Sequence, residues 1–351
     1  MITGLRLQHF RSYEDATFVF GDGVNILVGP NGSGKTNLLE ALLVAARGNS
    51  YRVGDGELVQ FGSIWARIDA EEDDGHHRTL KLQNNGAVKK TYEINEKPYQ
   101  RLPEHKKLPV VLFEPNHLLT LSGPPDGRRA YLDDILEQTT PGFTSFRRNY
   151  RRVLAQRNAL LKQPNTKPEE FFPWNLRLGE LGAVIHRSRT ALIETFNQAI
   201  AQLYTELSKD DIPVTLAYES RFAASDYETK LFHMLESNLH QDTARGFTSH
   251  GPHREDFGVL FDGHPSHSSA SRGEMRTAVL TLKILELREL HRATGRSPLL
   301  LLDDVFSELD SSRRHLLAAY MQHYQTFLTT TDADALTDTL AHSTLINIRH
   351  T

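Results

Sequence analysis

The sequence predicts an α/β fold in which both ends of the chain build one domain with a mixed β-sheet, while the middle forms a mostly helical insertion. Three observations support this prediction. Near the N-terminus, an apolar strand runs into a glycine-rich loop and then into an apolar helix. Alternating apolar and polar residues follow, as in an antiparallel β-meander. Near the C-terminus, a second apolar strand ends in two carboxylates, and the residues between these regions have helical periodicity.

The composition is that of a globular protein that stays out of the membrane. The 351 residues are 39% apolar and 24% charged, which suits about two folded domains. No run approaches the roughly 18 apolar residues of a membrane span, and the N-terminus lacks the apolar core of a signal peptide. The absence of cysteine excludes disulfides, zinc ribbons and thiol catalysis, and fits a cytoplasmic location. The formal net charge of -4 means that any nucleic-acid partner must bind a local basic surface.

The N-terminal part alternates between strands and one helix. Two strands, at residues 1–7 and 16–20, are expected to join Val24–Val28 in a sheet edge that leads into the glycine-rich loop, and residues 37–47 form the helix after it. An Asn-Gly pair at residues 85–86 favours a hairpin. The meander strands are expected at residues 65–71, 78–83 and 88–94, and a further buried strand at residues 108–113.

The middle of the chain is predicted to be helical. A turn cluster at residues 123–127 opens it, and a proline-bearing turn near residues 164–173 joins two long helices in an antiparallel pair. The helices are expected at residues 143–162, 176–207 and 226–242, with a short strand at residues 216–220. Beyond it we expect strands at residues 257–261, 299–304 and 326–328, and helices at residues 275–291 and 311–324. We therefore place one discontinuous α/β domain at residues 1–115 and 245–351, and a helical arm domain at residues 116–244.

The glycine-rich loop has the sequence of a phosphate-binding P-loop. It fits the pattern G-x-x-x-x-G-K-[ST] between a strand and a helix, where backbone N–H groups and the positive end of the helix dipole converge on an anion. Lys35 is predicted to reach the β- and γ-phosphates, and the Thr36 hydroxyl to bind Mg²⁺. The nucleotide-binding residues of this stretch are Gly29, Pro30, Asn31, Gly32, Ser33, Gly34, Lys35, Thr36 and Asn37.

The C-terminal strand has the form of a Walker B motif. Four leucines at residues 299–302 suit a parallel strand that is buried on both faces. Asp303 at its end is expected to hold Mg²⁺, and Asp304 to orient or deprotonate the attacking water as a catalytic residue beside Lys35. A buried strand that ends in a capping Asp-Asp turn is the alternative.

Two short motifs suggest that a second subunit completes the site. The run Ser271-Arg272-Gly273-Glu274 precedes a long helix, and small residues at a helix N-terminus form an anion site. The run at residues 307–310 follows Walker B, where a D-loop would meet a partner. Ser271, Arg272, Gly273 and Asp310 are therefore predicted to contact the nucleotide of the other subunit. Alternatively, Ser271 and Asp310 only cap the helices that follow them.

The order of these motifs resembles that of the ABC-type ATPase heads of the SMC and DNA double-strand-break repair families. More narrowly, the chain resembles the RecF family of bacterial recombination mediators. The resemblance covers nearly the whole chain and rests on HFRSYEDATFVFGDGVNILVGPNGSGKTNLLEAL, VLFEPNHLLTLSGPPDGRRAYLD, GPHREDF, SRGEMRT and LLLLDDVFSELD.

The resemblance implies a weak, DNA-stimulated ATPase that dimerises head to head on DNA when it binds ATP. Recombinational repair, replication restart and SOS induction would be its setting. Its partners would be double-stranded, gapped or junction DNA and the RecR and RecO proteins, with which it would load RecA. The resemblance also implies that Arg11 touches the nucleotide phosphates; a surface role is the alternative.

Several departures from the family pattern point to slow hydrolysis. Arg272 stands where transporter signatures carry glycine, and Asp304 is shorter than the usual glutamate. No clear Q-loop glutamine is present, so Glu114 or Asn116 would have to serve. Thr330 or Thr331 stands in place of a switch histidine. These departures, together with the basic helical arm, also disfavour the alternative function, a nucleotide-binding subunit of an ABC-type membrane transporter. A nucleotide kinase is disfavoured as well, because it would need neither residues 271–273 nor residues 307–310.

Two weaker signals concern DNA and metal. An arginine stripe would contact DNA phosphates, or else form a solvated helix face paired with nearby carboxylates. The stripe comprises Arg128, Arg129, Arg147, Arg148, Arg151 and Arg152, with Arg157 at its end. Residues 250–254 carry two histidines, but without cysteines or a familiar carboxylate spacing an interface or structural role is favoured over a metal site.

Overall fold

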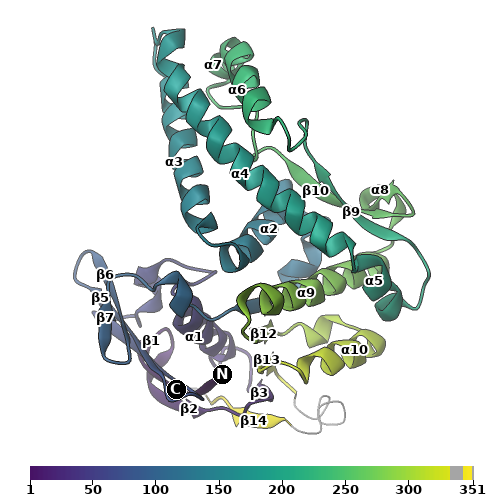
Figure 1. The fold of residues 1–351 in the computed structure, drawn as a ribbon. Helices are drawn as coiled ribbons and strands as arrows, with labels where there is room; N and C mark the ends of the chain where they lie inside the picture. The colour runs from purple at the N-terminus through teal and green to yellow at the C-terminus, as the bar shows by residue number, and fades with distance from the viewer. Residues whose placement is uncertain (333–342, 350–351) are drawn as a thin grey trace. The chain divides into compact units, whose positions relative to one another are not determined.

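The computed structural model describes residues 1–332 and 343–349 and divides into two compact units (Figure 1). The first unit comprises Met1–His117 and Glu286–Thr351, and the second comprises Leu118–Leu285. Among the described residues, no helix combines the length and the apolar composition needed to cross a bilayer.

The first unit contains two sheets of different kinds. A six-stranded antiparallel sheet has the order β2-β1-β4-β5-β6-β7, and a five-stranded parallel sheet has the order β14-β3-β13-β12-β8. The antiparallel strands are β1 (Ile2–Phe10), β2 (Tyr13–Val19), β4 (Trp65–Glu72), β5 (His77–Asn84), β6 (Val88–Ile94) and β7 (Lys97–Tyr99). The parallel strands are β3 (Val24–Val28), β8 (Val110–Phe113), β12 (Leu299–Asp303), β13 (Thr326–Thr330) and β14 (Thr344–Asn347). The predicted α/β class and meander are confirmed.

The predicted sheet edge before the glycine-rich loop is wrong. β1 and β2 pair with the meander through β1 and β4, whereas β3 joins the parallel sheet. Burial explains the separation. In β1, Leu5 and Leu7 are buried and Arg6 between them is exposed, as in a sheet with one wet face, whereas four of the five residues of β3 are buried.

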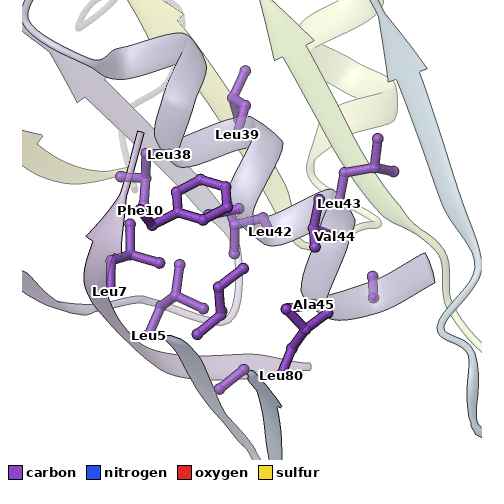
Figure 2. Packing of buried hydrophobic residues seen from close by; sticks show 14 of the residues in the cluster. Leu5, Leu7, Phe10, Leu38, Leu39, Leu42, Leu43, Val44, Ala45 and Leu80 are labelled. Carbon is purple, nitrogen blue, oxygen red and sulfur yellow. The ribbon is translucent and has the colours of Figure 1, made fainter. Parts of the chain in front are cut away.

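Helix α1 (Lys35–Arg47) joins the two sheets into one core. Nine consecutive residues, from Leu38 to Ala46, are buried. A helix that is buried on all sides needs partners on more than one face, and α1 contacts β1, β4 and β5 as well as β8, β12 and β13. Figure 2 shows its leucines beside Leu5, Leu7 and Phe10 of β1 and Leu80 of β5. The helix that starts at the glycine-rich loop is therefore fixed by the main core of this unit.

The second unit is mainly helical and contains a small antiparallel sheet of order β11-β10-β9. Its helices are α2 (Pro125–Thr139), α3 (Phe143–Leu161), α4 (Phe172–Asn197), α5 (Ile200–Ser208), α6 (Tyr227–Ser237), α7 (Leu239–Arg245) and α8 (Ser266–Ser269). Its strands are β9 (Val214–Glu219), β10 (Asp256–Phe261) and β11 (His264–Pro265). α3 and α4 pack side by side, as predicted (Figure 1). The helix expected at residues 176–207 ends at Asn197, however, and the one expected at residues 226–242 is broken at Asn238.

The chain returns to the first unit inside α9 (Arg272–Thr294), at Glu286, whereas the sequence places this boundary at residue 245. Buried polar contacts of the segment after residue 245 account for the difference. The Glu255 carboxylate accepts hydrogen bonds from Tyr218 Oη at 2.7 Å and Tyr227 Oη at 2.6 Å. Asp256 accepts two hydrogen bonds from Arg128 of α2. The strand β10 is therefore tied to the helical unit.

Candidate nucleotide-binding site

The P-loop lies between β3 and α1, as the sequence predicts. Gly32 and Gly34 have φ angles of 80° and 103°, in the left-handed region that favours glycine. Added at Gly34, a Cβ would lie 2.9 Å from both Ser12 Oγ and Tyr13 Oη. Glycine at this position therefore lets the β1–β2 turn sit directly against the start of α1.

Three contacts fasten the β1–β2 turn to α1. Tyr13 Oη donates to the Gly34 carbonyl at 3.0 Å, and Asn37 Nδ2 donates to Ser12 Oγ at 3.0 Å. Arg11 Nε donates to Glu40 Oε2 at 2.7 Å, and the Glu40 side chain is fully buried. Positions 34, 37 and 40 are three residues apart and so lie on one face of the helix. Sequence reasoning named Arg11 and Asn37 here but missed Ser12, Tyr13 and Glu40.

Lys35 turns back onto the P-loop. Its Nζ donates to the carbonyl oxygens of Gly29 at 2.6 Å and Pro30 at 2.9 Å. Burial lowers the pKa of Lys35, and the carboxylates of Asp304 and Asp303 oppose this shift. In the same loop, the buried Ser33 Oγ has no hydrogen-bond partner within the described residues. A buried polar atom without a partner fits a loop whose hydrogen-bonding groups serve a ligand.

The P-loop and the Walker B strand meet at one hydrogen bond. Thr36 Oγ1 donates to Asp303 Oδ1 at 2.9 Å, although the two residues are 267 positions apart in the chain. The sheet order β3-β13-β12 brings together the carboxyl ends of their strands. A hydroxyl and a carboxylate are oxygen ligands of the kind that Mg²⁺ takes, and this ion usually needs only one or two protein carboxylates. The residues present therefore fit a magnesium ion.

Asp304 has an unusual backbone. Its φ angle is 52°, which few non-glycine residues adopt. Its N–H donates to Thr329 Oγ1 at 2.9 Å, and its carbonyl accepts from Ser307 Oγ at 2.7 Å. Thr329 was not singled out from the sequence, because only the register Asp303↔Thr329 places it here.

The motifs predicted to act on a second subunit cap helices within this chain. Ser271 and Glu274 form a reciprocal capping box: Glu274 N donates to Ser271 Oγ at 3.2 Å, and Ser271 N donates to Glu274 Oε2 at 2.6 Å. Hydrogen bonds from Ser271 lower the pKa of Glu274. Asp310 accepts from Arg313 N at 2.9 Å at the start of α10 (Ser311–Met321), and this bond lowers the Asp310 pKa. Arg272 and Gly273 follow Ser271 in the first turn of α9, and Arg272 is exposed. Contact with a partner's nucleotide stays a prediction.

The predicted DNA-binding arginines fall into two groups. Arg128 pairs with Asp256, Arg129 donates to the Glu255 carbonyl at 2.8 Å, and Arg147 donates to Glu137 at 2.6 Å. The exposed members of the stripe are Arg148, Arg151 and Arg152. Arg157 does not extend this surface, since its side chain is fully buried.

The candidates for the Q-loop and the switch position, Glu114 and Thr330, lie at the ends of two strands of the parallel sheet. Glu114 follows β8, and its carboxylate is 3.8 Å from His117 Nε2. Thr330 ends β13 and donates to the Asp332 carbonyl at 2.9 Å. The residues described in the structure contain no group of three or more histidine or carboxylate side chains that is able to hold a metal ion.

A P-loop and a Walker B strand on one parallel sheet define a P-loop nucleotide-binding protein of the α/β class. The family model described as "RecF/RecN/SMC N terminal domain" matches residues 1–350. The chain is 38% identical to the DNA replication and repair protein RecF of Symbiobacterium thermophilum, over 95% of this chain and 92% of that protein. It is 33% identical to the RecF protein of Heliobacterium modesticaldum, over 95% and 93% of the two chains. The chain therefore belongs to the RecF/RecN/SMC N-terminal domain family and, within it, to the RecF proteins.

Solved structures agree with this assignment. A structure titled "RecF-ATPrS in RecFOR pathway" superposes with a TM-score of 0.86 at 28% identity, and covers 95% of this chain and 92% of the other. A RecF-ATP structure gives a TM-score of 0.83 at 28% identity, over 94% and 92%. An SMC head gives a TM-score of 0.56 at 14% identity, over 100% and 94%, which shows a shared fold alone.

Proposed function

We propose that this protein is an ATP-dependent DNA-binding protein of recombinational repair, replication restart and SOS induction. The observation that supports it most is the Thr36–Asp303 hydrogen bond, because it joins the P-loop hydroxyl to the Walker B carboxylate. The curated relatives are DNA replication and repair proteins, and two similar RecF structures are titled as complexes with ATP or ATPrS. This membership favours DNA repair over the transporter-subunit alternative.

The nucleotide site would work through its own side chains. Lys35 would exchange the carbonyls of Gly29 and Pro30 for phosphate oxygens, and its closeness to those carbonyls shows that the amine already lies over the loop. Thr36 and Asp303 would hold Mg²⁺, which when bound neutralises charge on the phosphates. Asp304 would orient or deprotonate the attacking water.

A second copy of the chain would close the site. Ser271, Arg272 and Gly273 of one copy, together with Asp310, would meet the nucleotide held by the other, so that ATP joins two heads on DNA. The exposed Arg272 beside the N-terminus of α9 supports this role, since the helix dipole favours an anion there. The short Asp304 side chain and the threonines at residues 330–331 suit slow hydrolysis, which would give the dimer a long lifetime.

DNA, RecO and RecR are the proposed partners. Together they would help to load the RecA recombinase in the cytoplasm. Two of the similar structures are titled as belonging to the RecFOR pathway, which supports the partner assignment. The DNA surface would include Arg148, Arg151 and Arg152, which are exposed along α3.

The test is the molar mass in solution, by light scattering, with and without ATP and DNA. The parent chain should dimerise with ATP. Asp304→Asn should stay dimeric for longer, because it lacks the carboxylate proposed to activate the attacking water. Asparagine is chosen because it tolerates the left-handed backbone of this position. Lys35→Ala should stay monomeric, whereas Lys97→Ala, which removes an exposed lysine of β7, should behave as the parent does. An Asp304→Asn protein that stays monomeric at saturating ATP contradicts the dimer.

A further inference from the structure

Thr329 occupies a central place beneath the Walker B carboxylates. β13, which carries it, lies between β3 and β12 in the parallel sheet, and Thr329 is paired in register with Leu27 on one side and Asp303 on the other. The residue is 1% exposed. Protein atoms therefore shield its hydroxyl from bulk solvent.

The Thr329 hydroxyl contacts both aspartates at once. It donates its only proton to Asp303 Oδ1 at 2.9 Å and accepts the Asp304 N–H at 2.9 Å. A hydroxyl has one proton to donate and two lone pairs to accept with, so these two bonds use it in complementary ways. The hydrogen bond to Asp303 uses a carboxylate oxygen as the acceptor, and a magnesium ion would bind the same carboxylate.

Each bond controls a different property of the site. Asp303 Oδ1 also accepts from Thr36, but Thr36 is a proposed metal ligand, so Thr329 is the hydroxyl that orients the Asp303 carboxylate without itself binding the metal. Asp304 has a φ angle of 52°, which side chains disfavour, and its N–H has a fixed acceptor in Thr329. The direction in which Asp304 presents its carboxylate thus depends on this bond.

We infer that Thr329 is a positioning residue that sets the orientation of both Walker B carboxylates through its hydroxyl. The inference rests on the proposed nucleotide function, because it assigns Thr329 a role toward the same magnesium and nucleotide site. A β-branched residue suits this task, since its χ1 angle has few choices in a strand and the hydroxyl stays aimed at Asp303.

The same strand offers a matched control in Thr326. It is also fully buried, but its hydroxyl shares its one proton between the backbone carbonyls of Met321, at 3.4 Å, and Tyr324, at 3.2 Å. Thr326→Val and Thr329→Val therefore each remove one buried hydroxyl from β13. Only Thr329→Val removes a hydroxyl that bonds Asp303 and Asp304. Thr329→Ser keeps the hydroxyl and loses only the methyl group.

The experiment measures the affinity for a fluorescent ATP analogue with Mg²⁺ and with EDTA, together with kcat and KM for ATP hydrolysis. In EDTA, Thr329→Val should bind the nucleotide analogue with an affinity within about 2-fold of that of the parent protein. The factor by which Mg²⁺ strengthens binding should be about 10-fold smaller in this variant than in the parent. Its kcat should be lower by about 10- to 100-fold, as for misplaced catalytic groups. Thr326→Val and Thr329→Ser should keep the Mg²⁺ effect and kcat within about 3-fold of the parent, because in each variant a hydroxyl at position 329 still contacts Asp303 and Asp304. If Thr329→Val does not fold, Thr329→Cys takes its place, since a thiol has similar volume but bonds weakly.

The outcomes separate this inference from the proposed function. If Thr329→Val or its cysteine replacement matches Thr326→Val in both the Mg²⁺ effect and kcat, or if Thr329→Ser loses as much as Thr329→Val, the positioning role of the hydroxyl is wrong. A parent protein that binds no nucleotide contradicts the proposed function itself, and the parent's own measurements reveal this without any variant.

Discussion

Arg157 carries a charge into the interior of the helical unit. Its guanidinium donates to Asn175 Oδ1, Asp242 Oδ2 and Thr248 Oγ1, each at 2.7 Å, and to the Leu235 carbonyl at 3.1 Å. Burial lowers the pKa of Arg157, and the hydrogen bond that it donates to Asp242 opposes that effect. Four acceptors from α4, α6 and the segment around α7 thus converge on one residue of α3. Arg157 is an internal tie of this unit.

Replacing Arg157 with leucine should destabilise the protein strongly. The change leaves the Asp242 carboxylate buried without its charge partner, which costs about 3–5 kcal/mol in the free energy of unfolding. Urea denaturation followed by circular dichroism measures this. Arg148→Leu on the exposed face of α3 is the matched control and should change the free energy by less than about 0.5 kcal/mol. Equal effects from the two variants would contradict the role given to Arg157.

At the scale of elements, α3 carries one arginine on its buried face and three on its exposed face. Phe143, Tyr150 and Arg157 are each seven residues apart, and they are buried together with Leu161. Arg148, Arg151 and Arg152 project from the exposed face. The seven-residue spacing was visible in the sequence and signals that Arg157 shares the buried stripe, but charge alone had grouped it with the surface arginines.

The exposed arginines of α3 should set part of the salt dependence of DNA binding. Each phosphate contact contributes about 0.9 to the slope of log K against log salt on duplex DNA, so Arg148→Glu with Arg151→Glu should reduce the slope by about 2. Fluorescence anisotropy over a range of salt concentrations gives the slope. Arg187→Glu, an exposed arginine of α4, is the control and should leave it unchanged. An unaltered slope in the double variant would place the DNA surface elsewhere.

At the scale of the whole molecule, the stability of the helical unit depends on a partly buried histidine, His253. In the helical unit, Tyr150 Oη bonds His253 Nδ1 at 2.7 Å, and His253 Nε2 bonds the Thr248 carbonyl at 3.0 Å. A carbonyl only accepts, so Nε2 carries the proton and the neutral ring accepts from tyrosine at Nδ1. Burial lowers the pKa of His253 to about 4, and the nearby Arg254 and Arg129 add to the shift.

Acid should therefore weaken the helical unit through this histidine. Because the folded pKa of His253 lies below the unfolded one, its contribution is complete above about pH 6.5 and is lost as the pH falls toward 4, which amounts to about 2 kcal/mol by pH 5. Thermal unfolding at pH 7.5 and pH 5 measures this loss. His253→Gln keeps a donor and an acceptor without the titration, and should show a smaller difference between the two pH values. An unchanged difference in that variant would rule out His253 as the cause.

Contiguous residues determined much of this protein by themselves. The strand, loop and helix at residues 24–47 lie next to one another in the chain, so local geometry was enough to predict the P-loop, and the leucine run before Asp303 predicted the buried parallel strand. The meander was readable for the same reason, because alternation and an Asn-Gly turn are local signals. The order of these motifs also indicated the family that the comparisons then supported.

Only the tertiary structure decided which distant residues share the site. The sheet order and register bring Thr36, Asp303 and Thr329 together from three parts of the chain, and the same order separates β1 and β2 from β3. Packing among the helices of the second unit turns Arg157 inward, and packing of the β1–β2 turn on α1 pairs Arg11 with Glu40. Hydrophobic patterns show that a strand is buried but not which strand lies beside it. Pairing is settled by the core as a whole, through contacts between residues that the sequence keeps hundreds of positions apart.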